Sequence, residues 1–389
     1  MSGESSTETN AIEPSSESSL LPTDRFARLR LGALVLSVVA LALFPLGVTI
    51  GPFTPLAAIK LAGALYLATF AMSWDMVSGY TGEISFGHSL FFGVGGYTAG
   101  MLNLHAGISL PLAIPAGAVA AAFAGFLIGF PSLRLRGPYF SLITLVVPII
   151  LSSLFLIFPN WTGGANGLVS AKSPNSSLAS LPFDPILNYV IAFAVFLLAL
   201  VVFLVVARSN TGEILTAIRE DEDAVTASGL NPAKYKLFAF LLSGLVGGFA
   251  GAVYVFSMNG SATPGAVLNL TLSIEVIIAA VLGGIGSITG AALGGIIFYL
   301  LLDVLSQVPY QIPLLNTTVS DVYFLIFGIV TLFFLFFIPD GLLRRGWGVV
   351  GRRFGREYEV AADGGLSPTQ RVIRKFKRGI DVLLGGDDR

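Results

Sequence analysis

The chain has 389 residues, of which 54% are hydrophobic and only 12% charged, and its mean hydropathy is +0.82. A soluble chain would need roughly twice that charged fraction to solvate its surface, so the composition excludes an ordinary soluble globular protein. The net charge of −1 gives no bias toward nucleic acid, and the lack of cysteine excludes disulfides, thiolate metal sites and a cysteine nucleophile. With His88 and His105 as the two histidines, metal chemistry has few candidates, and we expect no cofactor.

Residues 1–24 are rich in Ser, Thr and Glu and contain no Lys or Arg, which is typical of a disordered acidic tail. Three arginines, Arg25, Arg28 and Arg30, precede an apolar stretch over residues 31–50. This stretch is too long for the apolar region of a secretory signal. We therefore expect it to remain in the membrane.

About ten apolar segments follow one another, each near the ~20 residues that cross a bilayer as a helix. They cover residues 31–51, 56–78, 86–105, 109–131, 138–158, 186–207, 236–258, 271–283, 289–306 and 320–342. The sequence therefore predicts an all-α polytopic membrane protein whose transmembrane domain spans residues 25–343, with a charged loop at 208–236.

The basic residues predict the orientation of these segments. If the N-terminus is cytoplasmic, every Lys and Arg except Lys60 and Lys172 falls on the inner side. Cytoplasmic loops carry such an excess of positive charge. We therefore expect a multi-pass protein of the cell membrane with both termini in the cytoplasm, and we expect Lys60 to reach toward the outer interface.

The tail from residue 344 to 389 is basic. Ser367 and Pro368 are suited to start a helix, and apolar residues recur after them at helical spacing, with Lys and Arg interspersed. This pattern predicts an amphipathic helix on the anionic inner leaflet. A loosely ordered solubilising tail is the alternative.

Glycines cluster at two places within the apolar sequence, over residues 79–100 and 283–295. Each cluster follows a carboxylate in a similar context, Ser73-Trp74-Asp75 and Ser273-Ile274-Glu275, 200 positions apart. This spacing suggests two related halves, each with an interrupted helix near a substrate path. Glycine also allows close helix packing, and this reading stays open.

Ionisable groups inside a membrane are costly and usually functional, which makes Asp75 and Glu275 candidates. Capping of helix ends, or pairing with each other, is the alternative for both. His88 is more simply explained as a hydrogen-bonded structural residue beside Ser85 and Ser89. The candidate translocation-path residues are Asp75, Gly79, Tyr80, Gly82, Ser85, His88, Glu275, Gly283, Gly284 and Gly286.

The loop over 208–236 contains an amphipathic segment that no membrane task requires. Thr211 is suited to cap a helix that ends at Gly229 and Pro232, and its apolar face is Ile214, Leu215, Ile218 and Val225. Such a helix is suited to dock on another protein, with apolar anchors in a groove and charges at the rim. An ordinary connector lying on its own protein is equally compatible with the pattern.

Several motifs in this order make the chain resemble the membrane subunits of ABC importers for branched-chain amino acids, specifically the M-type permease, from about Leu61 to Leu343. The motifs are Gly79-Tyr80-Thr81-Gly82 with Ser85-Phe86-Gly87-His88 and Gly96-Tyr97-Thr98, Arg134-Leu135-Arg136-Gly137-Pro138-Tyr139-Phe140, Thr162-Gly163-Gly164-Ala165-Asn166-Gly167, Arg219 to Gly229 with Tyr235-Lys236-Leu237, Ser273-Ile274-Glu275 with Leu282-Gly283-Gly284-Ile285-Gly286-Ser287, and Pro339-Asp340-Gly341-Leu342.

The resemblance implies a transport subunit rather than an enzyme, and the absence of a Walker A loop agrees. It implies a second permease, two ATP-binding subunits and an external substrate-binding protein as partners, beside the lipid bilayer. It also implies that the loop seats a coupling helix in the ATPase subunit. The candidate coupling residues are Ile214, Leu215, Ile218, Arg219, Glu222, Ala224 and Gly229.

The sequence departs from the family pattern at two points. The family usually has an uncharged Asn at the position of Asp75, and the coupling motif is blurred as Glu222-Asp223-Ala224, with Gly229 one residue late. Permeases for urea or short-chain amides look very similar and are an alternative. An ion-coupled secondary transporter or channel is an alternative of another class, although it would not need a docking loop.

Overall fold

The computed structural model describes residues 25–51, 53–133, 139–169, 185–259, 261–312, 317–318, 322, 325–329, 332, 341–343 and 345–347. The chain divides into two compact units, Met1–Phe44 and Pro45–Arg389. Helix α1 (Arg25–Thr49) crosses that division. The predicted N-terminal tail and the C-terminal amphipathic helix lie outside the described residues.

The second unit is built from helices. Its long helices are α2 (Pro55–Trp74), α3 (Ser89–Ala106), α4 (Leu110–Ser132), α5 (Tyr139–Ile157), α7 (Pro185–Ala207), α10 (Pro232–Tyr254), α12 (Leu270–Gly283) and α13 (Ile288–Ser306). Its short helices are α6 (Pro159–Thr162), α8 (Asn210–Glu220), α9 (Glu222–Ala227) and α11 (Pro264–Val267). Two π-helical turns, which are wider than an α-helix, are η1 (Asp75–Gly79) and η3 (Val255–Asn259). One 3₁₀ turn, which is tighter, is η2 (Gly164–Asn166).

Two small antiparallel ladders are the β-structure of the described residues. Strand β1 (Leu168–Val169) pairs with β2 (Ser261–Ala262), with Leu168 opposite Ala262. Strand β3 (Gln311–Ile312) pairs with β4 (Thr317–Thr318). Because each strand has two residues, the expected all-α class is confirmed.

Eight helical stretches among the described residues are long and apolar enough to cross a bilayer. They are Arg28–Thr49, Pro55–Gly79, Leu110–Ser132, Tyr139–Ile157, Pro185–Ala207, Pro232–Ser257, Pro264–Gly283 and Ile288–Ser306. A polytopic membrane protein is thereby confirmed, with eight supported spans where about ten were predicted. The predicted segment 86–105 forms α3 without being among the eight, and 320–342 lies largely outside the described residues.

Local sequence explains where several helices begin. Proline is the first residue of α2, α10 and α11, a position where its missing N–H costs nothing. Thr54 caps α2 by accepting a hydrogen bond from the Ala57 N–H over 3.3 Å. The starts of α2 and α10 lie within a few residues of the predicted segment boundaries, whereas α11 was not predicted.

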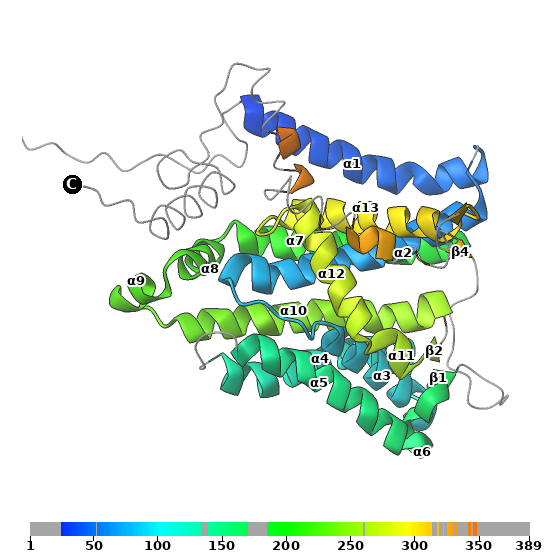
Figure 1. The fold of residues 1–389 in the computed structure, drawn as a ribbon, viewed down its shortest axis with the longest axis horizontal. Coiled ribbons are helices and arrows are strands. Elements are labelled where there is room, and N and C mark those ends of the chain that lie inside the picture. The colour runs from blue at the N-terminus through cyan, green and yellow to red at the C-terminus, as the bar shows by residue number, and fades with distance from the viewer. Residues whose placement is uncertain are drawn as a thin grey trace, which may run out of the picture. The chain divides into compact units, whose positions relative to one another are not determined.

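Two helices form the centre of the bundle. Helix α2 packs on α7 and α13, whereas α10 packs on α3 and α4, and α2 and α10 also contact each other (Figure 1). Glycines permit the closest approaches between helices. A Cβ on Gly95 of α3 would overlap the carbonyl of Gly248 on α10, and a Cβ on Gly283 of α12 would overlap the carbonyl of Gly290 on α13. Close packing therefore accounts for some of the clustered glycines.

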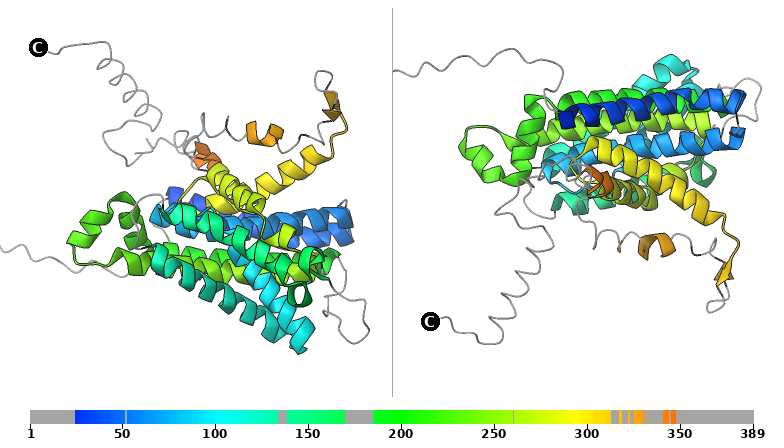
Figure 2. Two further views of the ribbon diagram at one scale, coloured as in Figure 1. Left: turned by 60° about the horizontal axis from the view of Figure 1, so that its bottom comes forward. Right: turned by 90° about the horizontal axis from the view of Figure 1, so that it is seen from above.

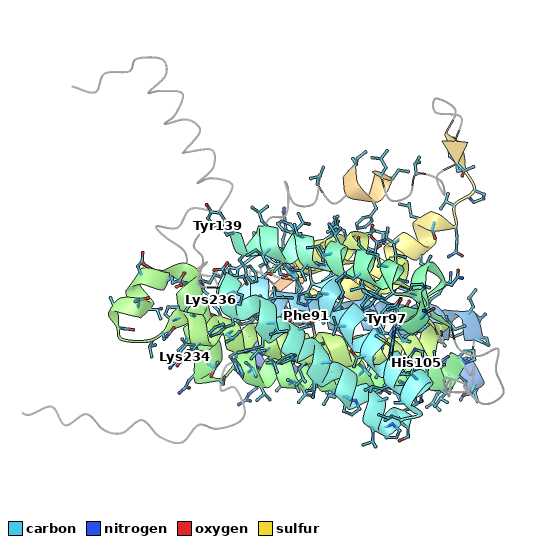
Figure 3. The ribbon with its side chains drawn as sticks, turned by 90° about the horizontal axis from the view of Figure 1, so that it is seen from below. Phe91, Tyr97, His105, Tyr139, Lys234 and Lys236 are labelled. Carbon is cyan, nitrogen blue, oxygen red and sulfur yellow. The ribbon has the colours of Figure 1, made fainter. Side chains whose placement is uncertain are left out.

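The two ends of the second unit differ. Helices α8 and α9 project beyond the ends of α7 and α10, whereas the β1–β2 ladder lies at the opposite end (Figures 1 and 2). Lys234 and Lys236 lie at the α8–α9 end, and His105 lies at the other end (Figure 3). The projecting helix pair is thus attached to one end of the membrane helices, which we call the coupling end.

Candidate functional site

The first glycine cluster breaks a helix, as the sequence predicted. After Trp74, helix α2 widens into the π turn η1, and regular helix resumes only at Ser89. π turns within α-helices are frequent at functional sites. Between η1 and α3, Gly82 has φ +80°, a left-handed conformation that favours glycine. The loop after η1 therefore leaves the helix axis at a defined point.

The second glycine cluster also breaks the helical path. Helix α12 ends at Gly283, Gly286 has φ +76°, and α13 begins at Ile288. Ser287 caps α13 by accepting a hydrogen bond from the Gly290 N–H over 3.2 Å. Both predicted interruptions are therefore present, each with glycine in the left-handed region.

The two breaks contact each other directly. The Gly286 N–H donates to Oδ1 of Asp75 over 2.7 Å. A Cβ on Gly79 would overlap the Asp75 carboxylate and lie 2.6 Å from the Gly286 nitrogen, so a side chain at Gly79 would exclude this bond. Asp75 is fully buried, and it does not pair with Glu275. Its observed role is to join the two halves of the glycine-rich sequence.

Arg219 links helix α8 to both breaks. Its Nη1 donates to the Gly79 carbonyl over 2.5 Å, and it interacts electrostatically with Asp75. Gly82 and Gly286 lie against the same side chain, where a Cβ on Gly82 would be 3.4 Å from Cγ of Arg219. The guanidinium is therefore held between the two breaks, and we call Arg219, Asp75, Gly79 and Gly286 the arginine latch.

Lys236 makes a second link to the same region. Its Nζ lies 2.7 Å from Oε1 of Glu83, in the first break, and 2.8 Å from Oε2 of Glu222, on α9. The lysine side chain is only 4% exposed, although it lies at the coupling end of α10 (Figure 3). A buried cation with two carboxylate partners fixes the positions of α9, α10 and the first break relative to one another.

The charged loop forms two helices rather than one. Ser209, not Thr211, is the N-cap residue of α8, and α8 ends before Asp221, whose φ of −155° and ψ of 99° are extended. Asp221 then caps α9 by accepting from the Ala224 N–H over 2.9 Å. The sequence pattern missed this break because Asp221 lies within four consecutive acids.

Three of the four residues on the apolar face of this loop are not available to a partner. Leu215 is 0% exposed, Ile218 is 3% exposed and Val225 is 7% exposed, because all three pack within the chain. The prediction that this face enters a partner's groove is therefore wrong. Helical periodicity showed which residues share a face, but it could not show what covers them. The accessible surface is the opposite one, which includes Glu220 and Ala224.

Loss of the Asp221 cap gives a small, local prediction. We expect Asp221→Ala to weaken α9 by about 1 kcal/mol, because the Ala224 N–H loses its acceptor. Hydrogen exchange at Ala224 should become faster, with no change in the membrane helices. Asp221→Asn is the matched control and should retain slow exchange. Equal exchange in the Ala variant would show that the cap contributes nothing.

His88 lies in a buried polar cluster. Its Nε2 is 2.8 Å from Oγ of Ser73 and 3.1 Å from Oγ of Ser243, and its ring packs on Phe70 and Phe91. The hydroxyl of Ser243 donates to the Ser73 carbonyl over 2.5 Å. These bonds tie the start of α3 to α2 and α10, which is the structural role weighed for this histidine.

The similar sequence contexts of Ser73 and Ser273 have a structural counterpart at the start of α3. Ser73 bonds His88, and Ser273 accepts from the Ser89 N–H over 2.9 Å. The nearby Ser85 is buried, and its carbonyl accepts from Nε1 of Trp74 over 2.7 Å. These serines secure the region around the first break.

Glu275 lies apart from the latch, at a cavity. The cavity has a volume of about 240 Å³ and lies among α2, α3, α10, α11, α12 and α13. Tyr66, Tyr254 and Tyr299 are among its lining residues, and Tyr66 is hydrogen-bonded to Ser257 over 2.6 Å. The cavity thus combines one carboxylate with aromatic walls.

The structure divides the predicted path residues into two groups. Asp75, Gly79 and Gly286 form the contact between the breaks, and Gly82 lies against Arg219. Gly283 and Gly284 lie at the end of α12, and Tyr80, Ser85 and His88 lie in or next to the first break. Glu275 alone of the predicted set lines the cavity. The predicted coupling residues Arg219 and Glu222 bond to the rest of the chain. Ala224 is exposed, and Gly229, with φ +86°, follows the end of α9.

Sequence reasoning missed several residues of these sites. Glu83, Ser243, Tyr66, Tyr254 and Tyr299 were not selected, and Lys236 appeared only within a motif. A usable signal was the presence of Lys236 at the first turn of an apolar span, where a cation needs a partner.

Lys60 forms an ion pair with Asp303 of α13 over 2.6 Å, with both side chains partly exposed. This pair lies at the end of α2 remote from the coupling end.

The fold and its sites define a polytopic membrane protein with a projecting helix pair linked to breaks in the membrane helices. Residues 57–335 match the family of the branched-chain amino acid transport system permease component, so the chain belongs to this family.

Individual relatives agree with this assignment. The chain is 32% identical to the high-affinity branched-chain amino acid transport system permease protein LivM of Escherichia coli over 254 residues, which is 58% of this chain and 59% of that relative. It is 30% identical to the permease protein BraD of Pseudomonas aeruginosa over 306 residues, 73% of this chain and 92% of the relative. LivH of Escherichia coli is 28% identical over 253 residues, 60% of this chain and 80% of that relative. No solved structure matched the chain.

Proposed function

We propose that the chain is the M-type permease subunit of an ABC importer for branched-chain or other hydrophobic amino acids. With a second permease it forms the translocation path, and ATP-binding subunits dock on the outer surface of α8 and α9. An external binding protein delivers the substrate. Both termini lie in the cytoplasm of a cell whose inner or plasma membrane holds the complex.

The observation that carries this proposal is the double attachment of the projecting helix pair. Arg219 bonds the Gly79 carbonyl, and Lys236 bridges Glu222 to Glu83, so α8 and α9 are each tied to the first break. The arginine latch also includes Gly286, which lies two residues before α13. A displacement of α8 therefore acts on both breaks at once.

The burial of the apolar face favours the transmission of a movement from α8 to the membrane helices. Because Leu215 and Ile218 pack within the chain, α8 moves together with the membrane helices rather than on a flexible tether. The partner then needs to contact only the exposed surface, on which Glu220 and Ala224 lie. A two-state element of this kind allows a contact outside the membrane to change a cavity within it.

The family relatives carry the branched-chain amino acid assignment, and both LivM and LivH proteins are among them. The identity to LivM of Escherichia coli favours the M-type subunit. A urea or short-chain amide importer remains the alternative within the class. Uptake by cells that express the complete importer, with leucine and urea as competing substrates, separates the two.

The docking surface is tested with two substitutions of opposite expectation. Ala224→Arg places a bulky charge on the exposed surface, so we expect at least roughly tenfold weaker association with the importer's ATP-binding subunit and unchanged thermal stability. Leu215→Asp places a charge in the buried face and should lower the unfolding temperature. Co-purification and thermal unfolding in detergent measure both effects.

Association with the ATP-binding subunit and the unfolding temperature are independent readouts. Normal association of the Ala224→Arg protein with the ATP-binding subunit would contradict docking on this surface. Lost association in a protein with an unchanged unfolding temperature is the supporting result. An ion-coupled transporter would instead transport its substrate with no ATP-binding subunit present.

A further inference from the structure

Glu275 is the starting observation, because its charge is not used within the described chain. It lies in the membrane-spanning stretch Pro264–Gly283 and is half-buried at the cavity wall. Among the described residues no hydrogen-bond donor or cation contacts its carboxylate, whereas Asp75, Glu83 and Asp303 each have such a partner. An ionisable group at membrane depth without a protein partner points to a ligand that supplies one.

Aromatic side chains form part of the cavity wall. The rings of Tyr66 and Tyr254 are 5.4 Å apart, those of Phe92 and Tyr254 are 5.2 Å apart, and those of Phe70 and Phe92 are 5.1 Å apart. All four rings line the cavity. Such a wall takes an aliphatic group by burying its surface, and its ring faces also attract an ammonium ion.

The first turn of α12 supplies a third feature. Thr271 and Leu272 line the cavity together with Glu275, which lies three to four residues further along the same helix, about 5–6 Å away. Helix N-termini favour anions, and helix ends at membrane depth bind substrate carboxylates in this way. The carboxylate of Glu275 therefore favours a cation, and the nearby start of α12 favours an anion.

The volume and depth of the cavity restrict its ligand. At about 240 Å³ it is smaller than the pockets of roughly 300–1,000 Å³ that hold drug-sized molecules. Along α2 its lining runs from Gly63 to Phe70, about 24 and about 14 Å from Gly79 by the rise of a helix. The cavity therefore lies within the membrane and away from the coupling end. An imported molecule must pass through this part of the membrane.

We propose that this cavity is an amino-acid-binding site within the single permease chain, selective for small zwitterions with an apolar side chain. Glu275 binds the ammonium group, the start of α12 receives the carboxylate, and the aromatic wall buries the aliphatic side chain. This inference deepens the proposed function, since it assigns part of the selectivity to the permease itself.

Binding to the purified full chain in lipid nanodiscs tests the site. We expect tritiated L-leucine to bind in a scintillation proximity assay, and Glu275→Gln to raise its Kd by roughly tenfold or more. Isopentylamine, which keeps only the ammonium group, should compete with leucine in the wild type and lose that ability in the variant. 4-Methylpentanoate, which keeps only the carboxylate, should compete equally in both, and urea should not compete.

A steric variant tests the location without changing charge. Ala266 is exposed and lines the cavity, so Ala266→Trp should fill it and abolish leucine binding without disturbing the core. Gly265 is the matched control, because a Cβ there meets no atom within 4 Å and Gly265 does not line the cavity. Gly265→Trp should bind leucine like the wild type.

The possible outcomes separate this site from the importer assignment. Undetectable leucine binding by the wild type, or binding unchanged in both Glu275→Gln and Ala266→Trp, would overturn the site while association with the ATP-binding subunit could still hold. Leucine binding that depends on Glu275, in a chain that never associates with an ATP-binding subunit, would support the site and contradict the importer.

Discussion

In the proposed importer, replacing Arg219 with Gln is expected to reduce uptake more than tenfold, while the proposed ATP-binding subunit stays bound. The guanidinium is the direct bond from α8 to the Gly79 carbonyl, and it also faces Asp75. Without it, a movement of α8 no longer reaches the contact between Asp75 and Gly286. Uptake of labelled leucine, measured beside ATPase activity, should show hydrolysis that is poorly coupled to transport.

The charge of Asp75 makes a second readout possible. Asp75 is fully buried, so removal of Arg219 leaves a carboxylate that has lost its electrostatic partner. We expect a loss of about 2 kcal/mol in stability, below the range for a fully buried pair because Arg219 is partly exposed. Asp75→Asn in the same chain should restore stability, since its side-chain oxygen can still accept from Gly286, but it should not restore coupling.

Glu220→Gln is the control for this prediction, because Glu220 is the next residue on α8 and is exposed. It should leave stability unchanged. If Arg219→Gln transported at the wild-type rate, the arginine latch would have no role in coupling. If the double variant recovered transport as well as stability, the effect would be one of buried charge alone.

Replacing Lys236 with Met is expected to give a large loss of stability at the coupling end. The lysine is 4% exposed and neutralises Glu83 and Glu222, so its removal leaves two carboxylates close together without a cation. Breaking a buried pair costs about 3–5 kcal/mol, and the exposure of Glu222 reduces this to about 2 kcal/mol. We expect the unfolding temperature in detergent to fall by roughly 4 °C.

Lys234 provides a matched control on the same helix. It lies two residues before Lys236 and is exposed, and both lysines are at the coupling end of α10 (Figure 3). Lys234→Met removes the same charge and adds the same side chain, yet it should change the unfolding temperature by less than about 1 °C. Equal shifts for the two variants would show that the bridge of Lys236 to Glu83 and Glu222 does not stabilise the chain.

The sites show how far sequence patterns reach. The two interruptions were predictable, because glycine after an apolar run has a local cause in backbone freedom. Their contact through Asp75 and Gly286 was not, because it joins residues 211 positions apart. The departure from the family's Asn at Asp75 was a usable signal, since a buried charge there requires a compensating one, and Arg219 is in place to provide it.

The coupling loop shows the same limit in another way. Ile214, Leu215 and Ile218 were correctly placed on one apolar face, and the structure buries Leu215 and Ile218 within the chain. Periodicity reports a preference for burial, but a partner and the chain's own helices satisfy that preference equally well. The choice between them depends on how α8 packs on α7 and α10, which is a property of the assembled bundle.

The amino-acid sequence by itself determined the class of protein, most of the helices and the position of the charged loop. Apolar length, helix caps and glycine are properties of neighbouring residues, and a bilayer makes them decisive because it admits few kinds of backbone. Only the tertiary structure separated Asp75, which joins the two breaks, from Glu275, which faces a cavity. Both are carboxylates in apolar helices, and what each one does is set by the groups that other helices bring within a few ångströms.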